Sequence, residues 1–406
     1  MDPTSSVPAS STPTPRLLLL VTVLYLGSGL PMGIVSELVP VWLKVHGASL
    51  EAIGLATLVG LPWTLKALWA PAVDRLGRLM GWATAALLGV AVGVAAVPWL
   101  GTGPAFWVAL LGVAAASATF DLAADGWTAT VVPVHQQGRV NGLRVAAYRV
   151  AMLLAGGGAV ALGAWVPWPT VFGLVALGAV LLALPLLRFP RADKPAEPPA
   201  RWLAELLSWL HEEGWANALA VAAFVLLFKL GDAAMGPMVK PFWLDAGLSL
   251  PEVGLVSITL GTSLSIAGAL VGGELTTRLG TFRALWLLGA LQALSNLGYA
   301  AAATWPGRPA VYAASVLESF TGGLGTAAFL AALMAMTRGR QATTRFALLS
   351  ALMGLTRTLS GAASGFGTAH LGYPAYFAFT FLLALPAFGL LPAMRRRLGG
   401  VGGRSA

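Results

Sequence analysis

The sequence lacks cysteine entirely and carries little charge. With no cysteine among its 406 residues, disulfide bonds and thiol chemistry are excluded, and the redox compartment stays open. Only 10% of the residues are charged, whereas soluble domains have about 25%. The low charge therefore excludes an ordinary soluble domain.

Motifs for catalysis and ATP binding are also missing. The chain has no His-Glu-x-x-His, Gly-x-Ser-x-Gly or Gly-x-x-x-x-Gly-Lys-Ser/Thr motif. Its four histidines are scattered: His46, His135, His211 and His370. We therefore predict no enzymatic activity, no metal site, no cofactor and no ATP-driven motor.

Long apolar runs, in contrast, are abundant. Hydrophobic residues make up 57% of the chain, and apolar runs recur from Leu17 to Leu391. A helix of about 20 residues crosses a bilayer, and these runs are too long and alternate too little for barrel strands. We predict an all-α polytopic membrane protein with twelve spans, near residues 17–43, 51–70, 80–99, 104–130, 142–165, 168–187, 216–244, 251–272, 284–303, 309–336, 345–370 and 373–393.

Polar segments divide these spans six and six. The N-terminal Ser/Pro/Thr-rich stretch has no basic region, so we predict a disordered tail before an uncleaved first span. A Pro-rich, charged segment follows the sixth span, and within it Arg201–Glu213 has the pattern of an interfacial amphipathic helix. The predicted parts are a tail (1–15), a six-helix bundle (16–188), a cytoplasmic linker (189–214), a second six-helix bundle (215–394) and a basic C-terminal tail (395–406).

The Lys and Arg residues predict the orientation. Outside the spans they lie almost entirely on one side, the exceptions being Lys44, Lys240 and Arg308. Because loops rich in Lys and Arg stay cytoplasmic, we predict an inner (plasma) membrane protein with both termini inside. This asymmetry explains the net charge of +9 without a nucleic-acid partner. Membrane lipid is the expected surrounding, and a monomer is the default.

The two halves of the chain repeat at an offset of 200 residues. "HGASLEAIGL" (46–55) aligns with "AGLSLPEVGL" (246–255), and the same register places Asp74 on Glu274 and Arg78 on Arg278. Two parallel six-helix repeats are typical of the major facilitator fold.

The loop "DRLGR" (74–78) resembles the cytoplasmic signature of major facilitator transporters. Charges at helix ends can latch neighbouring helices and release them as the halves move; a basic loop that only sets topology is the alternative. The latch candidates are Asp74, Arg75, Arg78, Glu274 and Arg278.

Four further stretches resemble the AmpG-like family of muropeptide, acetyl-coenzyme A and siderophore permeases. They lie at residues 58–75, 118–126, 228–254 and 346–361. The resemblance implies a solute permease. Phe120 replaces a glutamine usual in the family, and 406 residues leave no room for the two extra helices common in the muropeptide branch, so the length is more similar to the siderophore-importing branch.

Charged residues also occur within the spans. A charge at mid-bilayer costs about 2.5–3.5 kcal/mol, so such residues should face the bundle interior. Asp121 and Asp125 share one helix face at i, i+4 spacing. Depth suggests Arg149 or Lys66 as the partner of Asp125 and none for Asp121.

These residues are either structural ion pairs, such as Lys229 with Asp232, or groups that work in transport. A carboxylate that is hydrated from one side and paired from the other can carry a proton. The proton-coupling candidates are Asp121, Asp125, Asp232 and Glu318. The candidates for binding an anionic solute are Lys66, Arg149, Tyr148, Lys229, Arg357 and Trp63, although Trp63, like Trp69 and Trp243, also fits an interfacial aromatic belt.

Glycine and proline mark two further features. Gly29/Gly33, Gly89/Gly93 and Gly361/Gly365 are small-xxx-small pairs that let helices approach closely. The stretches "SGLPMG" (28–33) and "GDAAMGPMVKP" (231–241) occupy corresponding positions in the two halves, and we predict that spans 1 and 7 unwind there.

These observations predict a secondary active transporter. It would import a small anionic solute, such as a siderophore or muropeptide, by alternating access coupled to protons. An exporter of the same superfamily and a membrane-embedded enzyme or receptor are the alternatives. An aspartyl enzyme needs carboxyls that converge from different elements, whereas Asp121 and Asp125 lie on one predicted helix.

Overall fold

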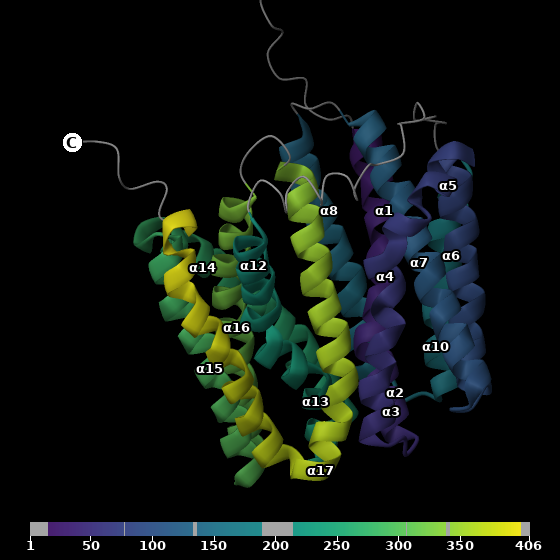
Figure 1. Ribbon diagram of the computed structural model, residues 1–406. Helices are drawn as coiled ribbons and strands as arrows, with labels where there is room; N and C mark the ends of the chain where they lie inside the picture. Colours follow the sequence, from purple (N-terminus) through teal and green to yellow (C-terminus); the bar gives the residue numbers. More distant parts are fainter. Residues whose placement is uncertain are drawn as a thin grey trace, which may run out of the picture. The chain divides into compact units, whose positions relative to one another are not determined.

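The computed structural model describes residues 15–76, 78–132, 136–188, 214–305, 307–337 and 342–398. The predicted disordered tail up to residue 14, the predicted interfacial helix Arg201–Glu213 with the rest of the linker at 189–213, and the C-terminal tail from 399 lie outside these residues. Every regular element in the described part is helical (Figure 1).

The helices of the first half of the chain correspond in sequence to the first six predicted spans. Its helices are α1 (Pro15–Gly33), α2 (Val39–Val45), α3 (Leu50–Leu55), α4 (Leu61–Leu65), α5 (Ala70–Leu76), α6 (Leu79–Ala96), α7 (Pro104–Val131), α8 (Gln137–Leu153), α9 (Ala159–Leu162) and α10 (Trp168–Leu186). Wide π turns, η1 (Ile34–Leu38) and η6 (Leu154–Gly158), join α1 to α2 and α8 to α9, and short 3₁₀ turns, η2 (Ala56–Gly60) and η3 (Lys66–Leu68), join α3, α4 and α5.

The helices of the second half correspond to the other six predicted spans. Its helices are α12 (Trp215–Phe228), α13 (Leu230–Asp245), α14 (Gly261–Leu279) after the π turn η7 (Glu252–Leu260), α15 (Thr281–Thr304), α16 (Arg308–Met336) and α17 (Ala342–Leu398). The long α17 reverses at Gly372, whose φ of 72° suits glycine. Figure 1 shows its two arms on either side of this bend, which match predicted spans 11 and 12.

Length and composition identify nine helices of the described part as able to cross a membrane. One of them, Leu348–Arg395, contains both arms of α17. The α3–α5 stretch and α15 are not among the nine and correspond to predicted spans 2 and 9. The helices are therefore consistent with the twelve predicted spans, and the all-α membrane class is confirmed.

Packing divides the described residues into two compact units. The first unit takes its residues from Met1–Ile34, Leu65–Gly156 and Pro167–Pro198, and the second from Val35–Thr64, Gly157–Val166 and Pro199–Ala406. In the first unit α1 packs along α8 and α6 packs against α7 and α10. In the second, α16 packs against α14 and α15, and α17 packs against α12, α13 and α3. The predicted division into two sequence repeats stays a prediction.

Small residues allow the closest helix contacts. A Cβ atom on Gly29 or Gly33 would overlap the backbone carbonyl of Tyr148 or Met152, and one on Gly365 would overlap that of Leu50. The predicted close packing is therefore confirmed for Gly29/Gly33 and Gly361/Gly365. It is not confirmed for Gly89/Gly93, because a Cβ on Gly89 would make only an ordinary contact with Ala116, at 3.7 Å.

The aligned glycines Gly54 and Gly254 have matching environments. A Cβ on Gly54 would lie 2.8 Å from the backbone nitrogen of Gly365, and one on Gly254 would lie 2.7 Å from that of Ala161. Both positions therefore require glycine for the same reason, because a helix backbone fills the space of the side chain.

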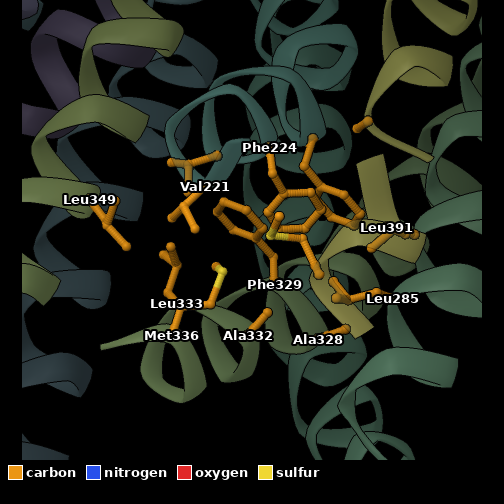
Figure 2. Close-up of a cluster of buried hydrophobic side chains, with 14 of the residues drawn as sticks. Val221, Phe224, Leu285, Ala328, Phe329, Ala332, Leu333, Met336, Leu349 and Leu391 are labelled. Atoms are coloured by element: carbon orange, nitrogen blue, oxygen red, sulfur yellow. The ribbon is translucent and has the colours of Figure 1, made fainter. Parts of the chain in front are cut away.

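The second unit has a large apolar core, drawn in Figure 2 around Val221, Phe224, Phe329 and Leu333. The ring of Phe329 stacks on Phe228 at 5.1 Å with an interplanar angle of 3°. In lipid, such contacts stabilise through van der Waals packing rather than through the expulsion of water.

The predicted unwinding of spans 1 and 7 is wrong in position. Residues 28–33 lie in α1 or at its end, and residues 231–241 are helical in α13 despite Pro237 and Pro241. The irregularities lie next to these stretches instead, at η1 and at Lys229, whose φ of −101° and ψ of 3° separate α12 from α13. A proline loses one hydrogen bond within its helix, and a neighbouring turn can absorb the distortion.

Candidate functional site

Asp121 lies in a cluster built from three elements of the first unit. Its carboxylate accepts a hydrogen bond from Ser28 Oγ of α1 at 2.5 Å and lies 4.0 Å from Lys66 Nζ of η3. Trp69 holds the chain after η3 against α7, because its Nε1 donates to Thr119 Oγ1 at 3.1 Å. The prediction that Asp121 has no partner is therefore wrong.

Asp125, one turn further along α7, binds Arg144 and Tyr25. Arg144 Nη2 lies 2.5 Å and Tyr25 Oη lies 2.6 Å from the same carboxylate oxygen. The Arg144 guanidinium also stacks over the Tyr25 ring, 4.3 Å from its centroid, in cation–π geometry. The Asp125 side chain is 48% exposed, against 16% for Asp121.

The predicted partners of Asp125, Arg149 and Lys66, are both wrong. Lys66 pairs with Asp121, and Arg149 is exposed on α8. Five residues of helix rotate a side chain by about 140°, so Arg144 and Arg149 cannot present the same face. The sequence indicated Arg144 only as a cytoplasmic charge and gave no role to Tyr25 and Ser28, although these two hydroxyls lie one turn apart on α1, as the two acids do on α7.

A second cluster surrounds the helix break at Lys229. Lys229 Nζ lies 3.3 Å from Asp232 Oδ2, which confirms the predicted pair, and donates to Thr326 Oγ1 of α16 at 2.8 Å. The Lys229 side chain is only 10% exposed. Glu318, also on α16, is half-buried and lies within electrostatic reach of Lys229 and Asp232.

Two further ion pairs join the end of predicted span 1 to the end of span 7. Glu37 lies 2.6 Å from Lys240 and Lys44 lies 2.6 Å from Asp245, and Tyr373 Oη of α17 also donates to Asp245 at 2.8 Å. Glu37 and Lys240 are both mostly buried. These pairs were not predicted from the sequence, although opposite charges near the ends of two apolar spans indicate that the residues can pair.

Comparisons with known proteins decide the family. The model of the Major Facilitator Superfamily matches residues 17–229. The anhydromuropeptide permease of Escherichia coli K12 is 34% identical over 396 residues, which cover 95% of this chain and 80% of that protein. The chain belongs to the AmpG-like branch of the major facilitator superfamily.

Other similarities of this permease agree. A putative transporter of Rickettsia conorii, named AmpG 4, is 26% identical over 90% of this chain and 93% of its own. A bacterial homolog of the human lysosomal transporter Spinster, solved in an inward-facing, unoccupied conformation, superposes with a TM-score of 0.74 at 17% identity, over 95% of this chain and 98% of that one. The protein is thus a multi-pass membrane transporter rather than an enzyme, as predicted.

The other predicted site residues differ in their exposure. Arg357 is exposed on α17, whereas Trp63 in α4 and Tyr148 in α8 are half-buried. Trp243 belongs neither to an interfacial belt nor to a solvent-facing wall, because it is fully buried and its Nε1 donates to Tyr299 Oη at 3.4 Å.

The predicted latch is only partly described. Asp74 and Arg75 lie in α5, but their side chains fall outside the described part, and Arg78 is exposed with φ of 55°. Glu274 and Arg278 pair with each other along α14 at 2.7 Å, and both are exposed. An exposed i, i+4 pair adds little to stability.

Proposed function

We propose that this permease imports a small anionic solute together with protons, by alternating access across the cytoplasmic membrane. The name of the E. coli relative supports a muropeptide as the solute, although the chain length suggested the siderophore branch. The loop charges support cytoplasmic termini, and the resemblance to the AmpG-like permeases supports the inward direction.

The Asp121 cluster is the observation that carries the proposal. Asp121 and Lys66 are 4.0 Å apart, too far for a hydrogen bond, so Lys66 is only loosely held. A proton that binds the Asp121 carboxylate removes its charge and frees the Lys66 ammonium for an anionic solute. Deprotonation restores the pair and expels the solute. Proton and anion therefore bind together, which is symport.

The pairs Glu37–Lys240 and Lys44–Asp245 support a conformational cycle. The predicted topology places these residues toward the outside, at the ends of the first span of each half. A state open to the outside requires the pairs to separate, so they favour the state closed on that side. The two predicted bundles, 16–188 and 215–394, would move apart there as the latch residues on the other side close.

The test is uptake of labelled solute by cells that lack their own muropeptide and siderophore permeases. We expect accumulation of an anhydromuropeptide that rises with external acidity and collapses with a protonophore. Undiminished accumulation without a proton gradient would exclude proton coupling, and net efflux would indicate an exporter. Uptake of an iron–siderophore complex alone would show that the solute is a siderophore and not a muropeptide.

One substitution tests proton coupling separately from solute binding. In Asp121→Asn the charge is permanently absent, so we expect solute exchange to persist while proton-driven accumulation is lost. Glu51→Gln, at the start of α3 and in neither cluster, is the matched control and should keep both activities.

A further inference from the structure

Arg357 lies in the middle of a membrane-spanning arm and has no acidic partner there. The first arm of α17 runs from Ala342 to the bend at Gly372, and Arg357 is midway between these residues, roughly 22 Å along the helix from each. Among the described residues, no carboxylate lies within ion-pairing distance of its guanidinium. An unpaired charge at this depth is costly in lipid, and only charges near the helix ends can reach the headgroups.

The lipid-facing side of this arm is on the opposite face. Leu359 and Phe366 are 53% and 45% exposed, and exposed apolar side chains of a membrane span contact lipid. Each residue turns a helix by about 100°, so both point about 160–180° away from Arg357. Arg357 is exposed as well, so its exposed surface is not the apolar one.

Segments of predicted span 2 pack beside Arg357. Gly354 and Gly361 lie one turn before and one turn after it, on the same side of α17. A Cβ on Gly354 would lie 3.2 Å from Thr64 Oγ1 of α4. One on Gly361 would lie 2.8 Å from the Thr57 side chain of η2. Arg357 therefore lies next to a close contact between helices and in a neighbourhood of hydroxyl groups.

The other cations predicted to bind an anion lack this combination. Lys66 and Lys229 each have a carboxylate of the protein within ion-pairing distance. Arg149 is exposed on α8, but Val145, one turn earlier on the same face, is 62% exposed. Exposure on that face does not distinguish water from lipid, whereas on α17 the arginine and the exposed apolar residues are separated.

We propose that Arg357 faces the aqueous path of the solute and binds a carboxylate of the solute. A guanidinium forms two parallel hydrogen bonds with a carboxylate, and no acid of the described chain competes for it. The name of the E. coli relative indicates a peptide-containing solute, which supplies carboxylates. The binding role rests on the proposed function, because it requires an anionic solute; the exposure to water does not.

Single cysteines test the exposure to water. The chain has no cysteine, so Arg357→Cys introduces one thiol, and its reaction with a charged, membrane-impermeant thiol reagent requires contact with water. In permeabilised membranes we expect Arg357→Cys to react about tenfold faster or more than Leu359→Cys and Phe366→Cys, the matched controls on the lipid-facing side. An anhydromuropeptide should slow the reaction of Arg357→Cys. Equal rates in the three variants would overturn the proposal.

Solute affinity tests the binding role. The full-length permease in detergent is titrated with an anhydromuropeptide and with an analogue whose carboxylates are converted to amides. We expect the loss of affinity on amidation to be about tenfold smaller in Arg357→Gln than in the wild type. Arg357→Lys should be intermediate, because an ammonium lacks the planar fork. Arg283→Gln, exposed at the start of α15, is the control and should match the wild type.

Stability and labelling separate the possible failures. Arg357→Gln should keep the unfolding temperature, because no ion pair is lost; a large fall would show a structural role and overturn the proposal. Fast labelling together with an unchanged affinity in Arg357→Gln would refute the binding role.

Neither measurement needs a proton gradient, so a permease that shows both effects but accumulates solute without a gradient refutes only the proposed coupling. If the wild type binds no muropeptide, the proposed solute fails, and the labelling rates alone decide whether Arg357 faces water.

Discussion

The two charged clusters of this permease are built differently. In the first, Asp121 and Asp125 of α7 meet cations from η3 and α8 and hydroxyls from α1. In the second, Lys229 and Asp232 are three residues apart at one helix break, and Thr326 is the remote partner. The first cluster therefore depends on how several helices are placed, whereas the second is mainly local.

This difference predicts different roles for the two clusters. A pair that joins separate helices breaks when those helices move, so it can couple protonation to conformation. A local pair moves with its own segment and keeps its geometry. Exposure does not follow this division, because Asp121 in the first cluster is 16% exposed and Asp232 in the second is 30% exposed. Water can replace a lost partner most easily at Asp125, whose side chain is 48% exposed.

The largest expected effect is on contacts between spans. The chain has no cysteine, so Glu37→Cys/Lys240→Cys creates a single pair of thiols, which a reducible bifunctional thiol reagent can bridge. If these helices separate in each cycle, cross-linking should block uptake completely and a reductant should restore it. Each single variant, treated in the same way, is the control. Full uptake by the cross-linked protein would show that these ends do not move apart.

Breaking the local pair should cost the most stability. Lys229→Met leaves the Asp232 charge without its partner, and removing one member of a buried pair costs about 3–5 kcal/mol. The cost here should be lower, because the Asp232 side chain is 30% exposed. Thermal unfolding in detergent measures it. Lys229→Met/Asp232→Asn should recover part of the loss; no recovery would mean that the lysine stabilises through packing alone.

The cluster between helices should lose less stability. In Arg144→Met, water can solvate the half-exposed Asp125, so we expect a loss of about 1 kcal/mol or less. Proton-driven uptake should fall far more than stability. Arg149→Met, five residues along the same helix, should have the smaller effect on both measurements. The reverse order would contradict the pairing of Asp125 with Arg144.

The smallest stability effect is expected at the predicted latch. Glu274→Gln removes an exposed pair within α14 and should leave the unfolding temperature unchanged. If Glu274 acts as a latch when the halves move, the initial uptake rate should fall several-fold. An unchanged rate would show that Glu274 and Arg278 form only a local ion pair on the surface.

The i, i+3 and i, i+4 relations within single helices were predictable from the sequence. Lys229 with Asp232, and Asp121 with Asp125 on one face, follow from helix periodicity alone. The glycine pairs of α1 and α17 were predictable for a similar reason, because small residues one turn apart form a flat strip on any helix.

Partners on different helices were not predictable in the same way. Depth in the membrane places Arg144, Arg149 and Lys66 near Asp125 only approximately, whereas an ion pair requires the correct face. Each residue turns the face by about 100°, so a small error in helix rotation selects the wrong arginine. The burial of the polar side chains of Gln292 and Asn296 was not predictable for the same reason, because burial depends on how neighbouring helices pack.

The sequence by itself determined that this is a helical membrane protein with a doubled pattern of spans, since hydropathy and charge act locally in each helix. Tertiary structure decided which cation serves which acid, where spans 1 and 7 depart from regular helix, and which polar side chains are buried. Those features depend on the rotation and contact of whole helices, which no single stretch of residues specifies.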